Sequence, residues 1–294
     1  MLKRNATDAD RTAVEGYMQA WGFSIESRFA QNTGVRFLGS TTLVEQAFGV
    51  QINDYNLSGH TFYANATPVL LPAALAPYVS SVLGLDNANR LRRAASDQTI
   101  IGPNGNPTPP YTPGEIASFY HLNALFSAGF KGTGQTIGIV TLERLNLSDV
   151  RAFEAAFGLP LSDVTVDVQG SPDFGTTETT LDVSWSSAMA PGARIVVVET
   201  TNSAADLANA FNYMATVYHP NVISFSFGTC DAEVAPGTQE ALHRLLGGIN
   251  VPIFVSSGDT GSRECDDNPG LTSASWPATD PLVTAVGGTS VPPN

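Results

Sequence analysis

The chain has little lysine, cysteine or charge. Lys3 and Lys131 are its two lysines, and charged residues make up 14% of its 294 positions. Lys and Arg total 14 against 27 Asp and Glu, a formal net charge of −13, which excludes the basic surface of a nucleic-acid-binding protein. No apolar run reaches the ~20 residues of a membrane-spanning helix, so no membrane partner is expected. Two cysteines, Cys230 and Cys265, are too few for a cysteine-rich scaffold.

The remaining composition is that of a folded protein of about two domains. Hydrophobic residues make up 43% of the chain, which excludes a disordered tail. The sequence pI of about 4.5 and the scarcity of charge suit a protein that works at low pH, where protonated carboxylates leave little net repulsion. No signal peptide opens the chain, and we expect the sequence to start inside a longer protein.

Residues 1–87 mix short helices with short strands. The patterns predict helices at 7–18, at 41–48 and from Leu71 onward, and strands at 35–38 and 61–63. Such a mixture is typical of a small α+β domain with an antiparallel sheet. Residues 88–113 differ, because a basic run at Arg90–Arg93 precedes a stretch rich in Pro, Gly and Asn. We interpret 88–113 as an exposed linker, with the basic run either a processing site or a solvated stretch.

Residues 114–294 alternate buried strands with helices. Continuous β-branched runs occur at 136–140, 195–198, 222–225 and 253–255, with helical periodicity near 148–157, 177–189, 204–217 and 238–247. This alternation predicts an α/β fold with a parallel sheet covered by helices on both faces. Active sites in such folds lie at the carboxyl ends of the strands.

The first candidate site is a pair of acids on the predicted helix 177–189. Glu178 and Asp182 are four residues apart, so their carboxylates share one face of the helix. Two such charges resist double ionisation and titrate as a unit, which suits proton transfer in acid. Acids in the first turns of a helix also simply favour the helix dipole, and spacing alone leaves both interpretations open.

Two further candidates follow predicted strands. Asp259 lies in a Gly-punctuated loop after strand 253–255, where it is either functional or a turn residue that bonds its own backbone. The strand that contains Ser224, Ser226 and Gly228 has a small, flexible end that could pair with an extended peptide, or it is simply a core strand. Cys230 and Cys265 follow these two strands, and neighbouring strand ends could bring them within disulfide distance.

Taken together, these stretches occur in the order of one known family. The helix continues from Asp182 through Trp185 to Ala188-Met189-Ala190-Pro191-Gly192, and is followed by Ser224–Gly228, Ser256–Asp259, and Trp276–Pro281 with Val283–Thr289. Ala47-Phe48-Gly49 and Val82–Asp86 add two motifs nearer the N-terminus. The set resembles the sedolisin family of serine-carboxyl peptidases over nearly the whole chain.

The resemblance implies a subtilisin-like fold for 114–294 and a ferredoxin-like activation prodomain for 1–87. It implies that Glu178 is the general base for a serine, that Asp182 orients Glu178, and that Asp259 donates a hydrogen bond to the oxyanion. It further implies that Ser224, Ser226 and Gly228 line the substrate, that the substrates are proteins or peptides, and that the prodomain packs on its own catalytic domain. A carboxylate base suits acid, because a histidine would be mostly protonated below pH ~6.5. The expected location is extracellular or an acidic lumen.

The family's serine motif is not matched. Gly288-Thr289-Ser290 has Asn294 where the family has proline and comes too early, so we interpret Ser290 as structural. We expect the serine and the family's calcium site to lie in a later half, the present chain to need no cofactor, and the chain alone to be inactive and poorly soluble. The prodomain is expected to be incomplete at its N-terminus.

Two other functions remain open on the sequence. The chain could be a non-catalytic remnant whose residues 1–95 act as an inhibitor or folding chaperone. A nucleotide-binding α/β domain is the weaker alternative, because Gly132-Thr133-Gly134 precedes the first buried strand instead of following it.

Overall fold

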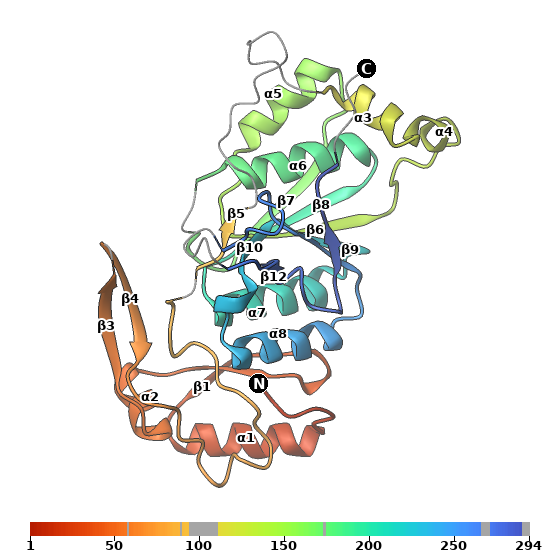
Figure 1. Cartoon of the computed structure of the whole chain (residues 1–294). Helices are drawn as coiled ribbons and strands as arrows, with labels where there is room; N and C mark the ends of the chain where they lie inside the picture. Colours follow the sequence, from red (N-terminus) through yellow and green to blue (C-terminus); the bar gives the residue numbers. More distant parts are fainter. Residues whose placement is uncertain (58, 89, 94–110, 173–174, 266–270, 290–294) are drawn as a thin grey trace.

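A computed structural model describes residues 1–57, 59–88, 90–93, 111–172, 175–265 and 271–289 (Figure 1). Most of the predicted linker and Ser290 lie outside these residues. The N-terminal segment contains α1 (Asp8–Ala20), β1 (Ser24–Arg28), β2 (Val35–Leu38), α2 (Thr41–Phe48), β3 (Ile52–Leu57) and β4 (His60–Asn65), with a 3-10 turn at Ala30–Asn32. This content confirms the predicted small α+β unit with antiparallel strands.

Local signals set the ends of the first two helices. The Thr7 side chain caps α1 by accepting the amide of Asp10, and the Asp10 carboxylate accepts the amide of Thr7, which completes a capping box. Ser40 caps α2, and Gly49 ends it in the left-handed conformation. The buried faces of these helices meet Leu2, Phe23 and Val50 in a core of their own.

The strands of the N-terminal segment form two separate antiparallel pairs, β1 with β2 and β3 with β4. A ferredoxin-like domain would join its four strands in one sheet, so the described strands depart from that detail. The helix predicted from Leu71 is also absent among the described residues, where turns occupy 73–78. Pro72 and Pro77 stand five residues apart, and the ring of Pro77 removes the amide that would continue the first turn.

The larger unit is built on one six-stranded sheet. Its strand order is β13-β11-β9-β6-β8-β7, and every neighbouring pair is parallel. The strands are β6 (Thr136–Thr141), β7 (Asp163–Val168), β8 (Arg194–Glu199), β9 (Val222–Phe225), β11 (Ile253–Ser256) and β13 (Thr284–Val286). Four of these match the predicted buried runs. The α/β class with a parallel sheet is therefore confirmed.

Helices cover both faces of this sheet (Figure 1). They are α5 (Leu147–Phe157) and α6 (Thr177–Met189) on one face, and α7 (Ala204–Tyr213) and α8 (Pro236–Gly248) on the other, with α3 (Pro113–Phe119) and α4 (Leu122–Ser127) nearer one end. Successive residues of β8 point to opposite faces of the sheet and pack in different hydrophobic cores. Val197 of β8 packs with Val183 of α6, whereas Val196 and Val198 pack with Leu207 and Leu245 of α7 and α8.

The N-terminal segment docks on the α7 and α8 face. Arg36 of β2 forms an ion pair with Asp206 at 2.6 Å, and Ser27 donates to Asn209 at 2.8 Å. The backbone amide of Ala30 donates to the side chain of Asn212 at 2.8 Å. The predicted packing of the N-terminal segment on the rest of the chain is present in the structure. None of the helices in the described parts of the chain is long and apolar enough to cross a bilayer.

Three short strands form a second, smaller sheet beside the large one. Its order is β12 (Ser275–Trp276), β10 (Phe227–Cys230) and β5 (Arg92–Arg93), all antiparallel. The predicted linker thus enters the fold as a strand. Leu91, the residue before β5, is buried, whereas Arg92 is exposed.

Candidate active site

Polar residues gather where the central strands end. Glu143 comes two residues after β6, Ser226 directly follows β9, and Asp259 comes three residues after β11. These three strands are neighbours in the parallel sheet, so their carboxyl ends open on one edge. That edge is where open α/β sheets bind their ligands.

Helix α6 brings the two predicted acids to this edge. Glu178 lies in its first turn and is 3% exposed, and Asp182 follows one turn later. A buried carboxylate is costly unless it is paired or keeps its proton. The pair is therefore enclosed by the fold and is not a solvated helix face.

Glu143 is a third buried carboxylate, which the sequence reasoning missed. It is 0% exposed, and its Oε2 accepts the backbone amides of Glu178 at 2.6 Å and Thr179 at 3.4 Å. Glu143 thus takes the place of a capping side chain at the N-terminus of α6, whose own Thr176 makes no side-chain cap. The available signal was an acid at the end of an otherwise apolar strand.

The two oxygens of Asp182 have different surroundings. Oδ1 accepts a hydrogen bond from the hydroxyl of Ser226 at 2.9 Å, whereas Oδ2 is buried without a hydrogen bond in the described structure. Burial, followed by the negative charge of Glu178, raises the pKa of Asp182 to about 8, against the opposing bond from Ser226. Asp182 therefore holds a proton through the acid and neutral range.

The three predicted substrate-lining residues fall in different places. Ser224 pairs through its main chain with Ile139 on one side and Phe254 on the other, so it has no free edge for a peptide. Ser226 is engaged with Asp182. Gly228 belongs to β10 and pairs with Arg92 of β5.

Linker residues occupy the edge of β10. Phe227 and Gly228 pair with Arg93 and Arg92 in antiparallel register. Nη1 of Arg93 lies 3.9 Å from Oε1 of the buried Glu143. A segment predicted as exposed linker therefore passes over the carboxylates as a strand.

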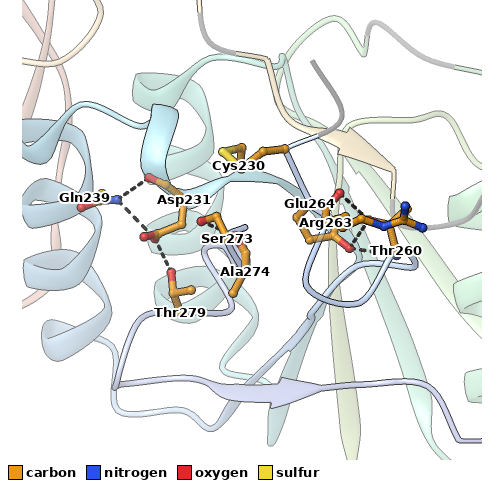
Figure 2. Close-up of a disulfide and its surroundings, with 10 residues drawn as sticks. Cys230, Asp231, Gln239, Thr260, Arg263, Glu264, Ser273, Ala274 and Thr279 are labelled. Atoms are coloured by element: carbon orange, nitrogen blue, oxygen red, sulfur yellow. Dashed lines mark hydrogen bonds between the residues drawn. A yellow bond between two sulfur atoms is a disulfide. The ribbon is translucent and has the colours of Figure 1, made fainter. Parts of the chain in front are cut away.

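The loop that carries Asp259 is held on both sides of that residue. Before it, the amide of Ser257 donates to the carbonyl of Val286 at 2.8 Å. After it, Thr260 donates its amide and its hydroxyl to Glu264 at 2.9 and 2.7 Å, as Figure 2 shows. Asp259 itself is exposed.

A disulfide links this loop to β10. Cys230 at the end of β10 is bonded to Cys265, with Cα atoms 4.7 Å apart (Figure 2). Beside it, the carboxylate of Asp231 accepts from Thr279 at 2.6 Å and from Gln239 at 3.2 Å. The segment around β12 and the start of α8 are thereby joined to the same corner.

Comparisons with known proteins find similarity along nearly the whole chain. A family model described as "Pro-kumamolisin, activation domain" matches residues 2–88. Kumamolisin from Bacillus sp. (strain MN-32) is 28% identical over 95% of this chain and 53% of its own length. Sedolisin from Pseudomonas sp. (strain 101) is 28% identical over 97% of this chain and 52% of its own length. The chain is thus similar to kumamolisin and sedolisin over nearly its whole length.

Other matches extend the same relationship. Tripeptidyl-peptidase sed5 of Aspergillus fumigatus is 24% identical over 97% of this chain. A solved structure of Pseudomonas sedolisin, a serine-carboxyl proteinase complexed with pseudo-iodotyrostatin, has a TM-score of 0.49, 28% identity and covers 60% of this chain and 53% of its own. The chain spans about half the length of the curated relatives it matches.

Within the described residues, no group of three or more His, Cys, Asp or Glu side chains is arranged to hold a metal ion. Glu143 instead accepts backbone amides at the start of helix α6, and Asp182 accepts the hydroxyl of Ser226. The described structure therefore brings three carboxyl groups together near the start of α6.

Proposed function

We propose that residues 1–294 belong to the zymogen of an acid-active endopeptidase of the serine-carboxyl type. The observation that carries this proposal is the enclosed pair Glu178 and Asp182, in which Asp182 has a pKa raised to about 8. When two nearby carboxyl groups have unequal surroundings, one keeps its proton and the other is ionised and can accept one. Homology to the sedolisin family supports the reaction class.

In the proposed reaction, Glu178 takes the proton of a serine hydroxyl while the serine oxygen bonds to the scissile carbonyl carbon. Asp182 keeps its own proton and orients Glu178. The carbonyl electron pair moves to oxygen, which accepts a hydrogen bond from the carboxyl of Asp259. Glu178 then returns the proton to the leaving amine as the carbon–nitrogen bond breaks. Water repeats the sequence on the acyl enzyme and regenerates the serine.

We do not assign the nucleophile to a described serine. Ser226 is committed to Asp182, and Ser290, outside the described residues, lacks the family's following proline. We propose that residues 1–294 alone do not hydrolyse peptides. Hydrolysis by this chain that disappears in Ser290→Ala would contradict that assignment.

The N-terminal segment is proposed to keep the enzyme latent. It docks through Arg36 and Asp206, and the strand Arg92–Arg93 occupies the edge of β10 that a substrate strand would use. Acid would weaken charged contacts between the two parts, and a cut within 88–113 would release the segment. The Cys230–Cys265 disulfide suits an oxidising, extracellular location.

The test is an activity assay on the translated product of the whole reading frame that contains these residues. Acid-denatured protein is incubated with it at pH 4, and new amino termini are counted. Glu178→Gln should lower the rate by ~10²–10⁴-fold, whereas Glu240→Gln, on the exposed end of α8, should not change it. Equal rates in both variants, or no hydrolysis at any pH by the processed protein, would refute the proposal.

A further inference from the structure

The side chain of Asn202 binds the main chain of the linker as a neighbouring strand would. Its Oδ1 accepts the amide of Leu91 at 3.1 Å, and its Nδ2 donates to the carbonyl of Leu91 at 2.9 Å. Both bonds are buried, and Asn202 is 3% exposed. One side-chain amide thus satisfies both polar groups of a single residue, independently of which side chain that residue carries.

Asn202 stands at the same edge of the sheet as the carboxylates. It follows β8 by three residues, and β8 lies beside β6, which leads to Glu143. Immediately after Leu91, Arg92 and Arg93 pair with Gly228 and Phe227. Three consecutive linker residues are therefore held through their main chains, the first by Asn202 and the next two by β10.

The side chain of Leu91 is buried beside this main-chain contact. Leu91 is 6% exposed and belongs to the apolar cluster that includes Phe225, Phe227 and Val198. An aliphatic side chain is thus recognised by burial, while its main chain is recognised by the amide of Asn202. The two together form one subsite for a residue of an extended peptide.

We propose that Asn202 is a main-chain clamp for peptide ligands, in a subsite that selects a large aliphatic side chain. When the linker leaves, the buried amide of Asn202 would have no partner unless another peptide residue takes the place of Leu91. Extended peptides supply the required N–H and C=O at every residue. The assignment of these peptides as substrates rests on the proposed function, but the clamp itself is a binding property.

The test uses the full chain with the variant Leu91→Asp, which places a charge in the apolar subsite and should expel the linker strand. Expulsion is checked by faster trypsin cleavage after Arg92 and Arg93. Binding of acetyl-Leu-Arg-Arg-amide is then measured by calorimetry, beside the same peptide with alanine first and with N-methyl-leucine first. N-methylation removes the hydrogen-bond donor and keeps the side chain.

We expect the leucine peptide to bind at least 10-fold more tightly than either altered peptide. Adding Asn202→Ala should weaken the leucine peptide by ~10-fold and abolish the difference that N-methylation makes. Adding Asn123→Ala, on helix α4, should change neither result. Continued protection of Arg92 and Arg93 in Leu91→Asp, no binding to the opened chain, or an unchanged affinity in Asn202→Ala would each overturn the clamp.

These readouts separate the clamp from the proposed function, because they measure binding without hydrolysis. Normal peptide binding together with full hydrolysis by Glu178→Gln would remove the proposed mechanism and leave the clamp standing. Loss of hydrolysis in Glu178→Gln with peptide affinities unaffected by Asn202→Ala would remove the clamp and leave the proposed mechanism standing. In that case Asn202 only fastens the linker.

Discussion

The hydroxyl of Ser226 donates to Oδ1 of Asp182 at 2.9 Å, while Oδ2 of the same carboxyl is buried without a hydrogen bond in the described structure. The residue that directly follows β9 thus donates to one oxygen, and the other lies near the acidic side chains of Glu178 and Glu143. Burial, followed by the charge of Glu178, favours the protonated form of Asp182 against the opposing bond from Ser226.

The raised pKa makes a prediction about stability against pH. Between its ordinary value of 3.8 and about 8, Asp182 keeps in the folded state a proton that the unfolded chain releases. Folding stability therefore falls as pH rises through this window, by at most ~1.4 kcal/mol per pH unit from this group. Asp182→Asn should match the wild type near pH 4 and melt several degrees higher near pH 8.

Thermal unfolding from pH 4 to pH 8 measures this difference. Asp163→Asn, on the exposed edge strand β7, is the matched control and should run parallel to the wild type. Parallel curves for Asp182→Asn as well would mean that Asp182 does not hold a proton in the folded state.

The large sheet could be predicted because its strands carry their own signal. The four runs at β6, β8, β9 and β11 are largely apolar, and most of their residues are buried or half-buried. The edge strand β7 has alternating exposure and was not predicted. Strands β5 and β12 are two residues long each, and they exist only because β10 lies between them, which no local pattern reveals.

The site could be predicted only in part, for a similar reason. Glu178 and Asp182 are one helical turn apart, a relationship that spacing alone contains. The role of Glu143 depends on the approach of β6 to the start of α6, 35 residues later. Leu91 was predicted to lie in an exposed linker. Composition alone does not reveal that the side chain of Asn202 binds the main chain of Leu91.

A second prediction concerns Glu143 as the acceptor for the start of α6. Glu143→Ala should leave the buried amides of Glu178 and Thr179 unpaired and lower the free energy of unfolding by ~1–3 kcal/mol. Glu143→Gln keeps an acceptor oxygen and should lose less. Urea denaturation at pH 5 compares the two variants. An equal loss in both would show that charge, and not hydrogen bonding at the helix terminus, is what Glu143 contributes.

A third prediction concerns the disulfide at the Asp259 loop. Replacing Cys230 and Cys265 together by serine should lower the free energy of unfolding by ~2–4 kcal/mol, because the bond closes a loop across 35 residues. Hydrogen exchange should also accelerate at Thr260, whose amide is held by Glu264. Unchanged exchange at Thr260 would mean that Glu264 holds the loop without help from the disulfide.

The fourth prediction concerns Gly228, which lies in β10 between its neighbouring strands β12 and β5. A Cβ at this position would lie 2.0 Å from Oγ of Ser275 and 3.0 Å from the carbonyl oxygen of Trp276. Gly228→Ala should therefore push β12 away or shift β10, and in either case loosen the pairing with Arg92. We expect a lower melting temperature and faster trypsin cleavage after Arg92 and Arg93.

Gly237→Ala is the control for this substitution. Its added Cβ meets nothing within 4 Å, and it lies in the first turn of α8, where alanine favours the helix. It should leave cleavage at the linker unchanged and raise the melting temperature slightly. If Gly228→Ala also leaves cleavage at Arg92 and Arg93 unchanged, the linker strand is held by Asn202 and Leu91 and not by its pairing with β10.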